Sequence, residues 1–238
     1  MRYQYLDILR WLCIFLMILF HLNYSLLHIF ENDVLNISQF FWYCVWRISA
    51  LGFMIISGVS YYLASKKYSY AQLQNKYLKY SWVLAVIAWA ISLGTYLFIP
   101  QQLILFGILH LFAISFFLLP FITRAKYWAF AALIILIVVS IFVDSEVESW
   151  YLFPLWFYNS DFQSADYYPL IPYFWYIVGW YLWARVLDRY KILSLLATTR
   201  EISLIEKILS YAWKKSLLLY IIHQPIIVIS IWIMKKIV

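Results

Sequence analysis

Three of the four histidines in this sequence lie inside long apolar runs, where an ionisable side chain is costly. They are His21 in FLMILFHLNYS, His110 in LILFGILHLFAISFFLLPF and His223 in LLLYIIHQPIIVIS. Arg47 is a strong cation deep within another apolar run. A neutral imidazole can take a proton from an amine or a hydroxyl, and a guanidinium can stabilise a developing oxyanion. These residue types indicate acid–base chemistry in a site with little water.

The composition places these residues in a membrane protein. The chain has 238 residues, of which 66% are hydrophobic and only 12% charged, whereas soluble domains have about 25% charged residues. The net charge of +7 comes from Lys and Arg in alternate short loops, so we expect no nucleic-acid partner. Cys13 and Cys44 both lie in apolar runs and indicate buried thiols rather than a disulfide framework.

The apolar runs predict the elements that must position the histidines. A bilayer-spanning helix needs about 20 mostly apolar residues. We therefore predict an all-α fold: a polytopic membrane helix bundle of about seven transmembrane helices, forming a single domain over residues 1–238. The predicted spans are 8–29, 39–64, 80–99, 103–122, 127–143, 170–187 and 213–234.

The charged residues between the spans predict the orientation. The predicted loop 65–79 holds four Lys and no acid, whereas segment 144–169 is acidic and aromatic, with no Lys or Arg. The positive-inside rule then places the amino terminus in the cytoplasm and the chain in the cytoplasmic (inner) membrane as a multi-pass protein. Segment 188–210 mixes apolar and charged residues at helical spacing, which predicts an interfacial helix on the cytoplasmic face.

The polar groups within the spans fall at one depth. Counting from the ends of their spans, His21, Arg47, His110 and His223 all come out near mid-membrane. We predict that the four share a polar cavity; the alternative is that each histidine only bonds a backbone carbonyl across helices. No HxxxH or HxxEH spacing is present, so we expect no metal.

Helical phase adds polar neighbours to these residues. Asp7 and Arg10 share a helix face with His21, and Tyr220 shares a face with His223. Asp7 and Arg10 could also be only an ion pair at the interface.

Five motifs in order resemble one family. The opening YLDILRWLCIFLMILFH has Asp-x-x-Arg and a histidine three turns later, WRISALGFMIISGVSYYLA contains Arg47, and FGILHLFAIS contains His110. ADYYPLIPYFWYIVGWYL and KKSLLLYIIHQPII complete the series. Together they resemble the heparan-α-glucosaminide N-acetyltransferase catalytic-domain family, within the wider transmembrane acyltransferase group. The sequence departs from the family pattern at Trp11, where glycine is usual, and at Ser25, where an acid is frequent.

The resemblance implies transfer of an acetyl or other acyl group from cytoplasmic acyl-CoA to an amine or hydroxyl of a sugar-type acceptor at the outer face. Acetyl-CoA would be the donor substrate. A further candidate partner is a second copy of the chain, as a homodimer. In this interpretation His110 or His21 is the general base and Arg47 stabilises the oxyanion. The expected substrate-binding residues are Asp166, Tyr220, His223 and Gln224, and those on the acyl-CoA side are Asp7 and Arg10.

A different class of protein would use the same residues. A small transporter, or a membrane subunit that binds haem or quinone, could also place histidines and an arginine at mid-membrane. The residues alone leave this non-enzymatic alternative open.

Overall fold

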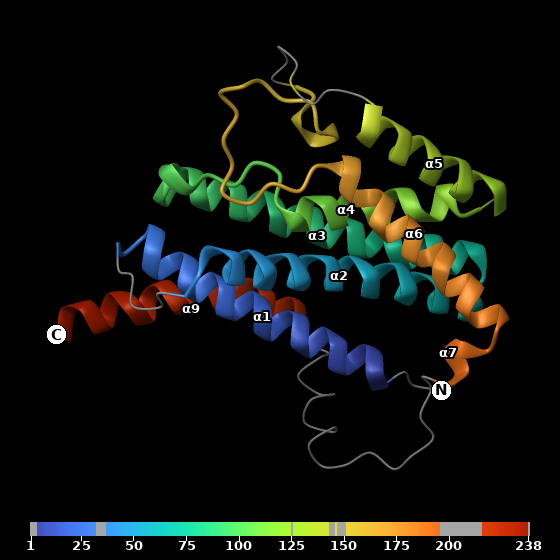
Figure 1. The fold of residues 1–238 in the computed structure, drawn as a ribbon, viewed down its shortest axis with the longest axis horizontal. Helices are drawn as coiled ribbons and strands as arrows, with labels where there is room; N and C mark the ends of the chain where they lie inside the picture. The colour runs from blue at the N-terminus through green and yellow to red at the C-terminus, as the bar shows by residue number, and fades with distance from the viewer. Residues whose placement is uncertain are drawn as a thin grey trace. The chain divides into compact units, whose positions relative to one another are not determined.

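The computed structural model describes residues 4–31, 37–124, 126–142, 146, 151–195 and 216–237. Over these residues the chain is helical, without a β-sheet; two isolated bridges pair Phe106 with Tyr167 and Glu146 with Tyr158. The α-helices are α1 (Gln4–His28), α2 (Gln39–Lys67), α3 (Tyr70–Phe98), α4 (Ile108–Ile122), α5 (Lys126–Phe142), α6 (Leu170–Arg189), α7 (Ile192–Leu195) and α9 (Ser216–Ile237) (Figure 1). Two 3₁₀ turns, η1 (Pro100–Gln102) and η2 (Phe153–Leu155), lie in the connections.

A helix stands at each of the seven predicted spans, so the all-α fold is confirmed. Within the described residues, four helices are long and apolar enough to cross a membrane: α1, α2, α3 and α9. Helices α4 and α5 are apolar but shorter. Helix α6 has 20 residues, but it is rich in Tyr and Trp and ends in charged residues. These helices indicate an integral membrane protein.

Two predicted boundaries were wrong. Residues 65–79 do not form a loop, because α2 continues to Lys67 and α3 begins at Tyr70. A capping box between Ser69 and Gln72 starts α3, and the Lys and Gln residues that follow favour a helix outside the apolar run. The fourth helix starts at Ile108 rather than 103, because residues before it pair with the segment that precedes α6.

The predicted interfacial helix at 188–210 lies largely outside the described residues. Its beginning is seen as the end of α6 at Arg189 and the short helix α7. The chain divides into two compact units, of which unit 1 comprises Met1–Ile56 and Leu187–Val238 and unit 2 comprises Ser57–Val186. The assignment of residues 1–238 to a single domain stays a prediction.

Helices pack closely within each unit. In unit 1, α1 lies beside α9, and the Ser49 hydroxyl of α2 donates to the Cys13 carbonyl oxygen of α1 at 2.9 Å (Figure 1). In unit 2, α3 packs along α4. A Cβ at Gly58 would clash with the Ile177 carbonyl oxygen, so this glycine lets α2 approach the backbone of α6.

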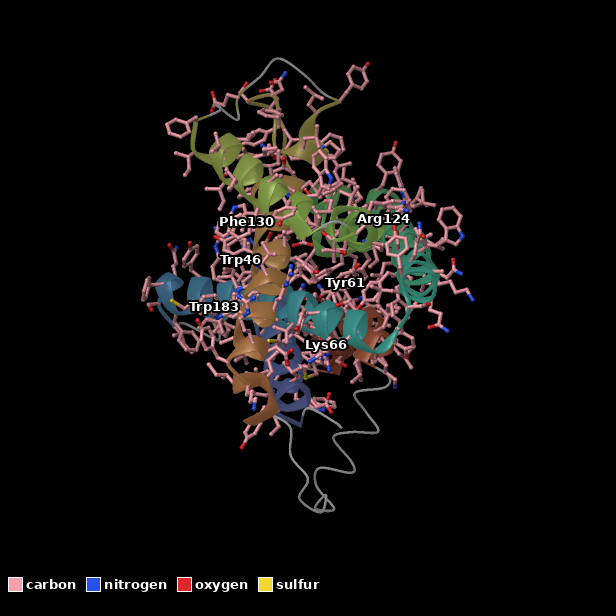
Figure 2. The ribbon with its side chains drawn as sticks, turned by 90° about the vertical axis from the view of Figure 1, so that its right-hand side faces the viewer. Trp46, Tyr61, Lys66, Arg124, Phe130 and Trp183 are labelled. Carbon is pink, nitrogen blue, oxygen red and sulfur yellow. The ribbon has the colours of Figure 1, made fainter. Side chains whose placement is uncertain are left out.

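Large apolar side chains are exposed along several helices. Phe98 is 83% exposed, and Phe130 on α5 and Trp183 on α6 are more than half exposed (Figure 2). Tyr61 is instead fully buried in unit 2, where its hydroxyl lies 2.8 Å from Thr123 Oγ1 (Figure 2). Apolar outer surfaces with hydrogen-bonded polar groups inside suit lipid surroundings.

Candidate active site

Two of the predicted histidines meet in unit 1. His21 on α1 and His223 on α9 have ring centroids 4.8 Å apart, with the rings nearly perpendicular at 82°. The two residues are far apart in sequence and come together because the apolar faces of α1 and α9 pack against each other. The two side chains are therefore in contact, and the catalytic site that they are expected to share stays a prediction.

Backbone contacts place a proton on Nδ1 of both rings. His21 Nδ1 lies 2.8 Å from the Met17 carbonyl oxygen, and His223 Nδ1 lies 2.6 Å from the Tyr220 carbonyl oxygen. A carbonyl oxygen only accepts, so each Nδ1 carries the proton that it donates. In the neutral rings Nε2 then keeps its lone pair, which is the form that a general base requires.

Two buried hydrogen-bond acceptors lie next to the histidine pair. Among the residues that the structure describes, His223 Nε2 and the neighbouring Gln224 Oε1 are buried without a hydrogen-bond partner. Gln224 Nε2 donates to the Ser25 hydroxyl at 3.0 Å, and Ser25 is fully buried. This bond fixes α9 against α1 one residue from His223. Two buried acceptors without donors are the arrangement expected of a site that receives a ligand N–H or O–H.

The predicted cationic residues have nearby partners on their own helices. Arg10 Nη1 donates to Asp7 Oδ1 at 3.0 Å, so the expected Asp7–Arg10 pair forms on α1. Arg47 Nε donates to the Tyr43 hydroxyl at 3.2 Å, and its guanidinium lies 4.4 Å from the centroid of the Trp46 ring. These aromatic contacts hold Arg47 as a charged group on α2.

The third histidine belongs to unit 2. His110 lies in the first turn of α4 and is buried, with Nε2 at 3.5 Å from the Ser92 hydroxyl of α3. Its ring stacks on Phe106 at 5.5 Å and meets the edge of Trp89. Ser92 was not predicted from the sequence, although a hydroxyl within the apolar run of α3 was a visible signal.

Asp166 is held at the start of α4 by Ile108, which lies two residues before His110 in the sequence. Its Oδ2 accepts from the Ile108 N–H at 3.0 Å, and Gly107 leaves the space that this carboxyl occupies. Burial raises the pKa of Asp166 to about 6, and the hydrogen bond from Ile108 opposes that rise. The predicted acceptor-binding acid therefore caps a helix, and it can hold or release a proton near neutral pH.

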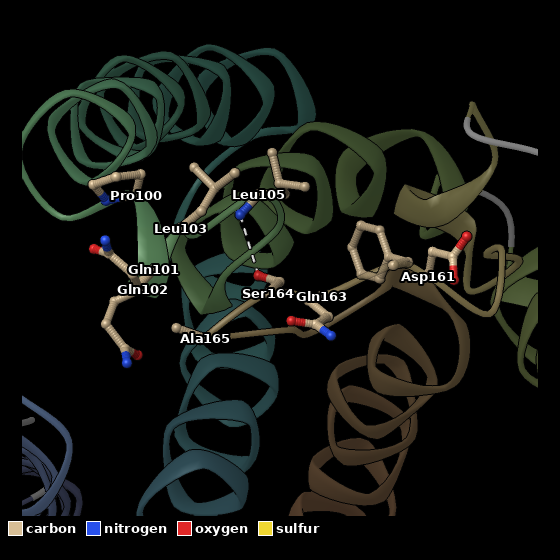
Figure 3. Close-up of a pocket in the computed structure, with 10 residues that line it drawn as sticks. Pro100, Gln101, Gln102, Leu103, Leu105, Asp161, Gln163, Ser164 and Ala165 are labelled. Atoms are coloured by element: carbon tan, nitrogen blue, oxygen red, sulfur yellow. Dashed lines mark hydrogen bonds between the residues drawn. The ribbon is translucent and has the colours of Figure 1, made fainter.

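A pocket lies along the same segments. The chain before α4 and the chain before α6 run side by side: the Ala165 N–H donates to the Leu103 carbonyl at 2.9 Å, and the Tyr168 N–H donates to the Phe106 carbonyl at 2.8 Å. Between them opens a cavity of about 490 Å³, lined by residues 100–103, 105 and 161–165 (Figure 3). No local sequence pattern predicted this pocket, because it depends on pairing between distant segments.

The predicted site residues thus fall into two groups. His21, Arg47, His223, Gln224, Tyr220, Asp7 and Arg10 belong to unit 1, and His110 and Asp166 belong to unit 2. A cavity shared by all three histidines and Arg47 stays a prediction, as do the individual roles of these residues.

The fold and the paired imidazoles define a helical integral membrane protein with a candidate acid–base centre. The chain belongs to the heparan-alpha-glucosaminide N-acetyltransferase catalytic-domain family, whose model matches residues 2–225. The family expected from the five motifs is thereby confirmed. No curated protein and no solved structure matches the chain. Family membership and the apolar helices together indicate a membrane acetyltransferase.

Proposed function

We propose that this protein transfers an acetyl group from acetyl-CoA to an amine or hydroxyl of a sugar-type acceptor, with the donor on the cytoplasmic side and the acceptor at the outer face. The family assignment supports the reaction class. The observation that carries the proposal is the pair His21 and His223, each with Nδ1 donating to a backbone carbonyl, and with a buried Nε2 of His223 that lacks a partner among the described residues.

The chemistry follows from the lone pairs on Nε2. The acceptor nitrogen or oxygen attacks the thioester carbonyl carbon, and His21 takes the proton that the attacking atom loses. The new C–N or C–O bond forms and the C–S bond breaks. The histidine then returns the proton to the leaving CoA sulfur, so the proton and charge balance. A positioned base of this kind contributes about 100- to 10,000-fold to the rate.

The remaining predicted residues have roles in this proposal. His223 lies beside His21 and orients the acceptor together with Gln224 and Tyr220, and Arg47 stabilises the oxyanion of the tetrahedral intermediate. Arg10, paired with Asp7, faces the CoA side. His110 and Asp166 belong to unit 2, and we propose a role in acceptor binding for both.

The membrane arrangement is part of the same proposal. All seven helices at the predicted spans cross the inner membrane, the amino terminus is cytoplasmic, and the segment after α6 lies on the cytoplasmic face. The outer segment before α6 is acidic in sequence, and it repels the phosphates of CoA while it admits a neutral or cationic sugar. A homodimer would be an additional assembly in this proposal, because a single chain carries all the proposed site residues.

One experiment separates this proposal from the non-enzymatic alternative. Purified protein in lipid nanodiscs is titrated with acetyl-CoA and assayed for thioester loss with glucosamine as acceptor. We expect saturable CoA binding and acceptor-dependent thioester loss. A protein that is folded but binds no acetyl-CoA at millimolar concentration contradicts the enzyme proposal. A Soret band in the purified protein would instead favour a haem-binding subunit.

A further inference from the structure

Lysines and an arginine gather at the end of unit 2 where the chain passes from α2 to α3. They come from the end of α2, the start of α3 and the turn after α4, and are Lys66, Lys67, Lys76, Lys79 and Arg124. We call these residues the basic face. Residues 34–143 contain no Asp or Glu, so no carboxylate lies near them in the sequence. The positive-inside rule predicts that this end of the unit is cytoplasmic.

Contacts between side chains bring the three elements of the basic face together. The Arg124 guanidinium lies 5.3 Å from the centroid of the Tyr70 ring, so the end of α4 meets the start of α3 (Figure 2). The Tyr61 hydroxyl of α2 lies 2.8 Å from Oγ1 of Thr123, the residue before Arg124. The Tyr61 ring also meets the Tyr77 ring of α3, with centroids 4.6 Å apart. The basic face is therefore assembled before any ligand binds, which lowers the cost of binding.

Aromatic rings hold two of the lysines close to each other. Lys76 Nζ lies 4.5 Å from the centroid of the Tyr68 ring, and Lys67 Nζ lies 5.7 Å from the same centroid. A tyrosine ring attracts a cation without neutralising its charge. Two ammonium groups at one ring repel each other, so an anion that contacts both relieves an unfavourable interaction. The oxygens of a phosphate group can accept hydrogen bonds from both.

An exposed apolar surface begins directly beside the basic face. On α3, Lys79, Trp82 and Val83 share one side of the helix by their spacing, and Trp82 is 74% exposed. On α4, the exposed Phe121 lies three residues before Arg124. Aromatic residues are enriched where membrane headgroups meet the hydrocarbon chains. A ligand at this position therefore meets cations at one end and an apolar wall next to them.

These two features together fit one class of ligand. We propose that the basic face binds the phosphate headgroup of an anionic phospholipid, whose acyl chains lie along the exposed apolar side of α3. Basic pockets at the cytoplasmic ends of membrane helices bind such headgroups, and the cytoplasmic leaflet carries anionic lipid. The phosphates of coenzyme A have the same charge but no long hydrocarbon chains, so the adjacent apolar surface favours the lipid. This binding does not depend on the proposed acetyltransferase function.

The preference for an anionic headgroup can be measured directly. The full chain in a neutral detergent is titrated with phosphatidylglycerol or with phosphatidylcholine of the same acyl chains, and bound lipid is counted by native mass spectrometry. Each Lys or Arg near an anionic headgroup contributes about fivefold in affinity. Two contacts to one phosphate therefore predict that phosphatidylglycerol binds about 25-fold more tightly than phosphatidylcholine. Equal affinity for the two lipids would overturn the proposal.

Variants locate the lipid on the protein. Lys76→Gln and Arg124→Gln should each weaken phosphatidylglycerol about fivefold and leave phosphatidylcholine unchanged, whereas Lys76→Arg, which keeps the charge, should retain the preference. Lys236→Gln is the matched control, because Lys236 is also exposed and lies 3.9 Å from the Trp232 ring, but belongs to unit 1. Thermal unfolding checks that each variant is folded. A preference for phosphatidylglycerol that survives in both Lys76→Gln and Arg124→Gln, or that Lys236→Gln removes as well, contradicts the assignment.

Competition separates the lipid from a soluble phosphate ligand. Bound phosphatidylglycerol should persist when coenzyme A or inorganic phosphate is added at millimolar concentration. If coenzyme A displaces the lipid, and Lys76→Gln and Arg124→Gln weaken coenzyme A to the same extent, the basic face is a site for soluble phosphates and the lipid assignment is wrong.

Discussion

The carboxyl of Asp166 should make the stability of the fold depend on pH between about 4 and 6. Burial raises its pKa from 3.8 to about 6 in the folded protein. Within that interval the folded state holds a proton that the unfolded state has lost, so stability falls as the pH rises. Below the interval both states are protonated and above it both are ionised, so the contribution is constant at each end.

The size of the change in stability follows from the pKa shift of Asp166. About two pKa units correspond to about 3 kcal/mol at 1.36 kcal/mol per unit. This is an upper bound because the side chain keeps some solvent contact. A charge near the first turn of α4 gains only about 0.3–1 kcal/mol from the helix dipole, so the cost of burial is the larger effect. For a chain of this length about 1 kcal/mol changes Tm by about 2–4 °C.

The test compares Asp166→Asn with the wild type. The amide oxygen of Asn can still accept from the Ile108 N–H, but the side chain no longer titrates. Thermal unfolding in nanodiscs at pH 4 to 7, at one scan rate, should show a wild-type Tm that falls by up to about 10 °C more than the Tm of the variant. Asp161→Asn, which removes an exposed carboxylate of the same segment, is the control and should keep the wild-type slope. Equal slopes in Asp166→Asn and wild type would refute the buried-carboxyl argument.

Three further predictions follow from other contacts. A double-mutant cycle of Ser25→Ala and Gln224→Ala should give a coupling of about 0.5–1.5 kcal/mol in unfolding, because their hydrogen bond is partly buried; zero coupling contradicts the contact. Tyr61→Phe should lower the unfolding free energy by about 1 kcal/mol, because it removes the hydrogen bond to Thr123 Oγ1. Denaturant titration measures this, and an unchanged unfolding midpoint would contradict the contribution of that bond. In a Cys-free background, an impermeant maleimide should label Gln163→Cys but not Tyr68→Cys in intact cells; the reverse pattern overturns the topology.

The helices could be predicted from the sequence because each forms from a continuous run of apolar residues. Runs of about 20 apolar residues predicted α1, α2, α3 and α9, and the first motif, with a histidine three turns after Arg10, pointed to the polar face of α1. Helix ends were less predictable. The capping box of Ser69 and Gln72 starts α3 outside the apolar run, where hydropathy does not indicate a helix.

The details of the site depend on contacts between distant segments. Equal depth in the membrane predicted that His21 and His223 could meet, but not that each Nδ1 would bond a backbone carbonyl of its own helix. The segments before α4 and α6 pair through backbone hydrogen bonds. This pairing brings the Asp166 carboxylate to the Ile108 N–H at the start of α4 and forms the pocket that Gln163 lines. Neither segment carries a strand or helix pattern, so no periodicity could have predicted that they lie side by side.

The most direct test of the proposed function is acceptor-dependent thioester loss from acetyl-CoA in His21→Ala, with His28→Ala, at the last residue of α1 and outside the predicted site, as a matched control. Both variants are checked for folding and for acetyl-CoA binding in nanodiscs. We predict that His28→Ala keeps wild-type turnover, whereas His21→Ala binds acetyl-CoA but loses about 100- to 10,000-fold in rate. Turnover that survives unchanged in His21→Ala would contradict the role of the histidine pair, and absence of acetyl-CoA binding in folded wild-type protein would contradict the proposed function itself.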